Sequence, residues 1–316
     1  MKTYLITGAG GFIGGHLVAS LINSGNKIVA TDLKPLAHWF QVHNSAYNIP
    51  DLDLRINLDP LPTDVDCIIN LACDHGGVGY LTNNDFRALM DISINTNLLK
   101  FALHNRISDY MFASSACVYN SKLQEDLSQD VYLKESDAWP ALPDMKYGLE
   151  KLYSEELCLQ AQKLHGIRVY LPRIHGCYGP YNHFNEIREK APNALLRKTV
   201  MANQSVEVWG TGDQRRSFMY VDDAVTGIIK LLSSSCHVPI NLGSDVTVTI
   251  HEVAKIAQQV VGKNLAIVPV DGTVGVNSRS SDNTFIVDQL GWKPSITIEQ
   301  GFQKMLPWIE EQVANL

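Results

Sequence analysis

The sequence lacks paired cysteines, long hydrophobic runs and an excess of basic residues. Its six cysteines are scattered and none forms a Cys-X-X-Cys pair, which argues against a zinc site. No stretch approaches the roughly 20 apolar residues of a membrane span, and glycine interrupts the first apolar run too early for a secretory signal. The formal net charge of −7 argues against a nucleic-acid surface. We therefore expect a cytoplasmic protein with reduced thiols, no metal ion, and neither membrane nor nucleic acid as a partner.

Short apolar runs alternate with helical periodicity in the first half of the chain. Nearly continuous apolar runs are typical of parallel strands that are covered on both faces. They are followed by helical patterns, of which residues 12–22 and 147–165 are the clearest. This alternation predicts an α/β fold with a doubly wound parallel sheet of the Rossmann type. The predicted strands are residues 4–7, 27–31, 67–72, 110–114 and 168–171.

The regular alternation ends near residue 173. Residues 175–212 are rich in glycine, proline, asparagine and aromatic residues, which indicates a smaller, mixed lobe that binds substrate. Residues 217–221 are predicted as a strand followed by a capped helix that returns to the main sheet, and residues 248–316 show two further helical patterns. We predict a cofactor-binding domain over 1–173, with 213–240 returning to it, and a mainly substrate-binding lobe over 174–316.

A glycine-rich segment, Gly8-Ala9-Gly10-Gly11-Phe12-Ile13-Gly14, joins the first predicted strand to the first helix. A glycine turn alone is weak evidence, but at this position it lets backbone N–H groups approach a pyrophosphate at the helix N-terminus. The predicted phosphate-binding residues are Gly8, Gly11, Phe12, Ile13 and Gly14.

Asp32 ends the second strand, where a carboxylate would bind the adenosine ribose hydroxyls. Because it would repel a 2′-phosphate, the predicted cofactor is NAD rather than NADP. Asp53 and Leu54 are predicted to flank the adenine, although a surface loop is nearly as good an interpretation. Leu71 and Ala72 end a strand on the nicotinamide side.

Tyr147 and Lys151 are four residues apart and share one face of a predicted helix. A free tyrosine is a poor base at neutral pH because its pKa is about 10. A neighbouring ammonium and a positive nicotinamide ring would stabilise the phenolate and lower that pKa. Ser115, at the end of a predicted strand, supplies a hydroxyl that could align the substrate alcohol. This order of motifs resembles the extended short-chain dehydrogenase/reductase family over nearly the whole chain.

Longer strings resemble the GDP-mannose 3,5-epimerases in the same order and with similar gaps. The most specific are Ser114-Ser115-Ala116-Cys117 and Arg188-Glu189-Lys190-Ala191-Pro192; the others are residues 74–79, 133–140, 147–152, 216–218, 241–245 and 281–283. The resemblance implies a homodimer formed through helices near 87–103 and 147–165. It also implies epimerisation at C3 and C5 of a GDP-hexose through a transient 4-keto sugar.

The resemblance assigns further roles to individual residues. Cys117 and Lys190 match the acid/base pair that exchanges protons with the sugar. Tyr147, Lys151 and Ser115 match the redox residues, and Tyr147 and Lys151 are also predicted to bind the cofactor. The residues implied to contact the nucleotide sugar are Gly76, Gly77, Ser115, Lys190, Lys198, Arg216 and Arg279.

Departures from the family keep other functions open. His75 replaces a methionine and Gly176 an asparagine, and both positions are expected near the sugar. A 4,6-dehydratase is disfavoured because Ala116 and Cys117 stand where those enzymes carry an acidic pair. An epimerase or 4-keto reductase acting on another nucleotide sugar remains an alternative. So does a non-catalytic NAD-sensing scaffold, although such proteins commonly lose the tyrosine or the lysine.

Overall fold

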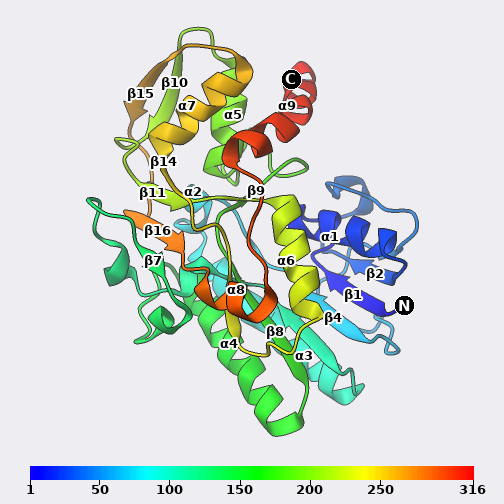
Figure 1. Ribbon diagram of the computed structural model, residues 1–316. Coiled ribbons are helices and arrows are strands. Elements are labelled where there is room, and N and C mark those ends of the chain that lie inside the picture. The colour runs from blue at the N-terminus through cyan, green and yellow to red at the C-terminus, as the bar shows by residue number, and fades with distance from the viewer.

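The computed structural model describes residues 1–316. The larger part of the molecule is built around a parallel sheet of seven strands (Figure 1). Its strand order is β13-β8-β5-β4-β1-β2-β3, and the short β6 pairs with the end of β8. The predicted doubly wound fold is therefore confirmed. The strands are β1 (Thr3–Thr7), β2 (Lys27–Thr31), β3 (Tyr47–Ile49), β4 (Cys67–Asn70), β5 (Asp109–Phe112), β6 (Ser114–Ser115), β8 (Arg168–Ile174) and β13 (Pro239–Leu242).

Both faces of this sheet are covered by helices, which explains the continuous apolar runs. Successive strand residues enter different cores: Leu5 belongs to one and Ile6 to the other. Helices α1 (Phe12–Asn23) and α6 (Val221–Leu232) cover the Ile6 face, and α3 (Asp85–His104) and α4 (Lys146–His165) cover the Leu5 face. Each strand thus buries side chains on both sides, as parallel strands between two helical layers do.

The smaller lobe combines three helices with two small sheets. Helices α5 (Ala191–Met201) and α7 (Ile250–Val261) pack beside β10 (Ser205–Trp209), which pairs in parallel with β15 (Ala266–Val270), and α9 (Ile298–Ala314) packs against α5 and α7. The second sheet has the order β14-β11-β16-β7. Its strands are β14 (Thr247–Thr249), β11 (Arg215–Ser217), β16 (Ser278–Ser281) and β7 (Tyr132–Leu133).

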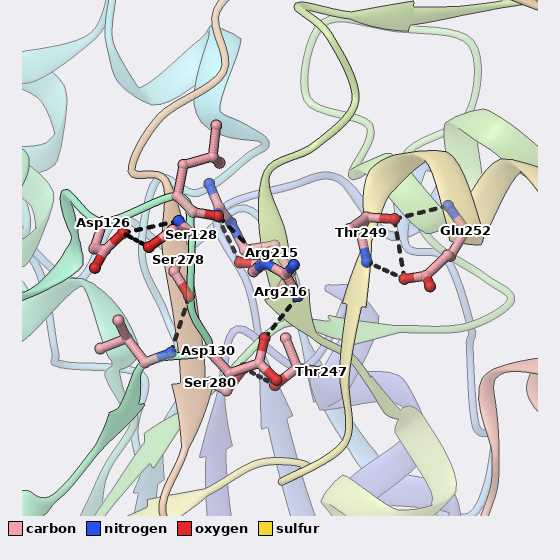
Figure 2. A network of polar contacts seen from close by, with 12 residues as sticks. Asp126, Ser128, Asp130, Arg215, Arg216, Thr247, Thr249, Glu252, Ser278 and Ser280 are labelled. Carbon is pink, nitrogen blue, oxygen red and sulfur yellow. Dashed lines mark hydrogen bonds and ion pairs between the residues drawn. The ribbon is translucent and has the colours of Figure 1, made fainter.

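Figure 2 shows polar contacts that join this second sheet to its surroundings. The Thr247 and Ser280 hydroxyls lie 2.8 Å apart, between β14 and β16. Arg215 of β11 forms an ion pair of 3.0 Å with Asp130, which lies just before β7. The sheet therefore ties a segment near residue 130 to strands from the C-terminal part of the chain.

The expected single strand at residues 217–221 is wrong. β11 ends at Ser217, and the separate β12 (Met219–Tyr220) pairs with β9 (Cys177–Tyr178) rather than joining the main sheet. The chain returns to the main sheet through α6 and then β13, which pairs with β8.

The C-terminal part also contains more elements than the two expected helical patterns. Residues 248–316 contain α7, α9 and the short α8 (Thr284–Leu290). Seven residues are too few for a clear periodic signal. The one remaining α-helix is α2 (Val78–Leu81), and no helix is both long and apolar enough to cross a membrane.

Candidate active site

A cavity of about 1410 Å³ lies between the carboxyl ends of the main strands and the smaller lobe. Every predicted site residue except Lys151 lines it. These residues are Gly8, Gly11, Phe12, Ile13, Gly14, Asp32, Asp53, Leu54, Leu71, Ala72, Gly76, Gly77, Ser115, Cys117, Tyr147, Lys190, Lys198, Arg216 and Arg279.

The loop between β1 and α1 packs so closely against backbone atoms that two of its positions require glycine. Gly8 has φ +71°, and a Cβ there would lie 2.8 Å from the Leu71 carbonyl. A Cβ on Gly14 would lie 2.2 Å from the Gly8 oxygen. The first turn of α1 has no side-chain cap and no acidic residue, so its N–H groups remain available to an anion. The loop therefore fits a dinucleotide pyrophosphate.

The two carboxylates predicted to lie near the adenosine both line the cavity, in different environments. Asp32 accepts a hydrogen bond of 3.0 Å from the Lys34 N–H, and burial raises its pKa. Lys34, which the sequence analysis missed, donates from Nζ to the Gly10 carbonyl at 2.7 Å. Asp53 forms an ion pair of 2.7 Å with Arg55, whose hydrogen bonds lower the pKa of Asp53. Asp32 is therefore the carboxylate without an ionic partner within salt-bridge distance.

Tyr147 and Lys151 lie in the first turns of α4, with Lys151 behind the tyrosine. The Lys151 ammonium lies 5.4 Å from the centre of the Tyr147 ring and 3.4 Å from the Glu150 carboxylate. Burial is the largest single influence and acts to lower the pKa of Lys151, but Glu150, Cys73 and Asp91 together raise the net pKa above its usual value. Lys151 therefore remains a cation, although it does not line the cavity. Burial raises the pKa of Tyr147 well above its usual value.

Cys117 lies beyond Ser115 in a short 3₁₀ turn, Ala116–Val118. The Cys117 N–H donates to the Ser115 hydroxyl at 3.2 Å. Arg279 of β16 donates from Nη1 to the Cys117 sulfur at 3.4 Å. Its other two nitrogens bond Gln124 and Asp144, each at 2.5 Å. Burial raises the pKa of the Cys117 thiol.

Lys190 occupies the N-cap position of α5, and burial lowers its pKa. The neighbouring Arg188 fixes this part of the chain. Its Nη1 donates to Asp74 at 2.7 Å and to the His75 carbonyl at 2.9 Å, and its guanidinium lies 3.8 Å from the centre of the Tyr80 ring. The loop that carries Lys190 is thereby joined to the loop that carries Gly76 and Gly77. The sequence indicated Arg188 only as part of a matching string.

Lys198 and Arg216 are held differently. Lys198 lies 3.6 Å from the Glu207 carboxylate. Arg216 donates to the main-chain carbonyls of residues 215, 274, 276 and 277, with no carboxylate within salt-bridge distance. Burial lowers the pKa of Arg216 to about 10. Arg216 therefore stays cationic at neutral pH and brings an unbalanced positive charge to the cavity.

The sequence profile of the NAD dependent epimerase/dehydratase family matches residues 4–243. The chain belongs to this family. The membership confirms the predicted enzyme class and the predicted cofactor, NAD.

The similarity to individual relatives extends over nearly the whole chain. GDP-mannose 3,5-epimerase 1 of Oryza sativa subsp. indica is 39% identical over 310 residues, covering 98% of this chain and 82% of the relative. The Arabidopsis thaliana GDP-mannose 3,5-epimerase is 38% identical with the same coverage. These matches confirm the resemblance noted in the sequence.

Solved structures of related enzymes share the fold. The UDP-glucose 4-epimerase of Thermotoga maritima has a TM-score of 0.85 at 18% identity, covering 98% of this chain and 99% of that one. The Bacillus cereus UDP-glucuronic acid 4-epimerase, solved with UDP-glucuronic acid and NAD, has a TM-score of 0.83 at 23% identity over 98% and 99% of the two chains.

The two departures from the family strings both line the cavity. The centre of the His75 ring lies 5.1 Å from that of Tyr147, and His75 Nδ1 is buried without a partner. Burial lowers the pKa of His75 well below its usual value, so the ring is neutral at physiological pH. A Cβ on Gly176 would lie 2.7 Å from the Ser217 carbonyl. The cavity thus contains an imidazole at position 75 and lacks room for a side chain at position 176.

No group of three or more histidine, cysteine or acidic residues is arranged to hold a metal ion.

Proposed function

We propose that the protein is a nucleotide-sugar 3,5-epimerase that acts on GDP-mannose or a closely similar GDP-hexose. The observation that carries this proposal is that Cys117 and Lys190 line the same cavity as Tyr147. They come from separate elements, the 3₁₀ turn after β6 and the N-terminus of α5. A simple redox enzyme needs the tyrosine but no second acid/base pair. The GDP-mannose 3,5-epimerases at 38–39% identity support the choice of substrate.

The cations of the cavity suit a substrate that carries a diphosphate. Lys190 and Arg216 are partly buried cations with no acidic side chain within salt-bridge distance in the free protein. A buried charge without a counter-ion costs free energy, which an anionic ligand would offset. Lys198 and Arg279 line the same cavity and, in this proposal, also contact the nucleotide sugar.

The redox step rests on Tyr147. In the proposed reaction its phenolate removes the proton of the C4 hydroxyl, and Ser115 holds that hydroxyl in line. Lys151, fixed by Glu150 at 3.4 Å, supplies a permanent positive charge behind the phenol. NAD, when bound in the glycine loop, would accept the hydride from C4 and would return it to the ketone after the proton exchange. The resulting ketone acidifies the hydrogens on C3 and C5.

Cys117 and Lys190 then exchange protons with these carbons from opposite faces of the ring. Their pKa values move toward each other, because burial raises the pKa of the thiol and lowers that of the ammonium. Both shifts act in the direction that favours exchange of the acid and base roles between the two groups, as an epimerisation requires.

Heavy water provides the test. Turnover of GDP-mannose in D₂O should place deuterium on C3, C5 or both, detected by NMR. Cys117→Ser should suppress this labelling, because a serine hydroxyl hardly ionises at neutral pH. Cys236→Ser, at a buried cysteine outside the cavity, is the matched control and should label normally.

Product without deuterium on either carbon would refute the acid/base roles. It would favour the alternative, a C4-epimerase or 4-keto reductase of another nucleotide sugar. A protein that binds NAD but turns over no nucleotide sugar would favour the NAD-sensing scaffold.

We also propose a homodimer formed through α3 and α4, which pack side by side at the bottom of Figure 1. Large apolar side chains are exposed on both helices. The exposed fractions are 77% for Phe86 and 42% for Met90 on α3, and 44% for Leu149 and 53% for Tyr153 on α4. Each pair is spaced i, i+4, which places its members on one face of the helix. A second copy of the chain would cover this surface.

The proposed roles of the two parts of the chain, and the proposed cellular location, follow the sequence predictions. We assign NAD binding to residues 1–173 with 213–240, and substrate binding mainly to residues 174–316. The six cysteines are unpaired, which supports a reducing compartment, and we propose the cytoplasm.

A further inference from the structure

The Cys117 sulfur has a charged neighbour with fixed geometry. Arg279 Nη1 lies 3.4 Å from the sulfur, while Nη2 and Nε are held at 2.5 Å by Asp144 and Gln124. The side chains of Arg279 and Asp144 are only 12% and 10% exposed, so water screens them weakly. Each nitrogen of the guanidinium therefore already has a protein partner, and one of these partners is the proposed acid/base thiol.

Asp144 carries a negative charge that is paired with Arg279 alone. Its Oδ2 faces Arg279, but its Oδ1 is buried with no hydrogen-bond partner. Arg279 is the single cation within salt-bridge distance of this carboxylate. The field that Asp144 exerts on the thiol is thus opposed mainly by the guanidinium between them.

The other groups around Cys117 come from α4, α5, β11 and β6. Tyr147 of α4 is a neutral phenol in the free protein, because burial raises its pKa. Lys190 at the start of α5 and Arg216 of β11 are cations that interact electrostatically with the thiol. Ser115 accepts the Cys117 N–H. Asp144 is therefore the one acidic side chain among these neighbours.

We propose that Arg279 and Asp144 form a positioning pair that sets the proton affinity of the Cys117 thiol. The guanidinium stabilises the thiolate, and Asp144 both holds the guanidinium against the sulfur and limits that stabilisation. The inference rests on the proposed function, in which Cys117 exchanges protons with the sugar. It adds to the resemblance, which gave Arg279 only a substrate contact and gave Asp144 no role.

Electrostatics supports opposite effects for the two residues. Arg279 acts to lower the pKa of Cys117, whereas Asp144 acts with burial to raise it. Removing the cation should therefore make the thiol harder to ionise, and removing the carboxylate should make it easier, since Gln124 still anchors the guanidinium. General damage to the site would expose the thiol in both variants and shift them in the same direction.

The test measures thiol reactivity in the NAD-loaded protein without substrate. Iodoacetamide alkylation of the Cys117 peptide is followed by mass spectrometry between pH 6 and pH 10, and the midpoint of the rate profile is compared. Arg279→Gln should raise the midpoint by at least about one pH unit, or about tenfold in rate at pH 7.5, and Asp144→Asn should lower it by a similar amount. Arg279→Lys keeps the charge and should stay closer to the unmodified protein than Arg279→Gln does.

Asp130→Asn is the matched control, because Asp130 pairs with Arg215 on β11 and does not line the cavity. It should leave the midpoint unchanged. Shifts of the same sign in Arg279→Gln and Asp144→Asn, or no shift in either, would overturn the inference. If Arg279→Gln does not fold, the midpoints of the other two variants decide the question. Arg279→Lys should then have a midpoint above that of the unmodified protein, and Asp144→Asn a midpoint below it. Normal deuterium labelling together with unchanged midpoints would refute this inference but not the proposed function. Absent labelling together with the expected midpoint shifts would refute the proposed function but not this inference.

Discussion

Helix α4 begins directly against the backbone of Cys117, and Gly148 makes this approach possible. A Cβ at Gly148 would lie 2.0 Å from the Cys117 carbonyl oxygen and 2.9 Å from Cβ of Pro143. Real Cβ contacts are essentially never shorter than 3.0 Å. Gly148→Ala must therefore move Tyr147 and Cys117 apart by at least about 1 Å, because the opposing atom is backbone and cannot rotate away.

The expected result is a folded protein with impaired chemistry. Overpacking of this kind costs about 1–3 kcal/mol of stability, and a 1 Å misplacement of reacting groups can cost roughly 10²-fold in rate. Turnover of GDP-mannose and deuterium exchange should fall together by about that factor, while NAD content should change much less because the glycine loop belongs to another element, the turn between β1 and α1. Thermal unfolding, NAD absorbance and NMR detection of product measure these three properties.

A matched control separates stability from geometry. Gly25 has φ +77°, and no atom lies within 4 Å of the place that a Cβ would occupy, so Gly25→Ala is strained but meets no steric overlap. It should lose about 1 kcal/mol of stability and keep its turnover. If Gly148→Ala turned over substrate as fast as Gly25→Ala, the close placement of Tyr147 and Cys117 would not matter for the reaction and our reasoning would be wrong.

Three further predictions concern the cofactor, the pH dependence and the assembly. Asp32→Ala should narrow the preference for NAD over NADP in binding titrations, and equal affinity of the unmodified protein for both would contradict the role of Asp32. Burial lowers the pKa of His175 to about 4, so the unfolded chain binds more protons between about pH 6.5 and pH 4, and stability should fall by on the order of 3 kcal/mol as the pH drops through that window. His175→Gln cannot take up this proton, and its stability measured by urea unfolding should depend less on pH. Phe86→Glu with Tyr153→Glu should give a monomer in light scattering, and an unchanged mass would exclude the α3–α4 surface as the interface.

Local sequence patterns were sufficient to predict the residues of the cofactor site. The glycine loop, Asp32 and the Tyr147–Lys151 spacing each lie within one turn or one helix, so their sequence neighbours define their geometry. Continuous apolar runs marked the buried strands, because helices cover both faces of the sheet. Lys151 lies behind Tyr147 rather than in the cavity, which still agrees with an electrostatic role.

Long-range pairing defines the rest of the site, and no local pattern predicts it. Asp144 and Arg279 are 135 residues apart, and Cys117 and Arg279 are 162 apart. The end of β11 at Ser217 and the start of β12 at Met219 depend on different partner strands, since β11 pairs with β14 and β16 and β12 pairs with β9. The sequence supplied Arg279 only through resemblance, and it gave no signal for Asp144.

The pairing of β7 with β16 couples the unfolding of the two parts of the molecule. β7 precedes α4, whereas β16 follows α7, and the two are hydrogen bonded in register from Ser280 to Tyr132 and from Ser281 to Leu133. A fragment cut before β16 would leave β7 without its partner and would also remove Arg279 from the Cys117 sulfur. The smaller lobe is therefore not a detachable module, and we expect heat or denaturant to melt both parts in one cooperative transition.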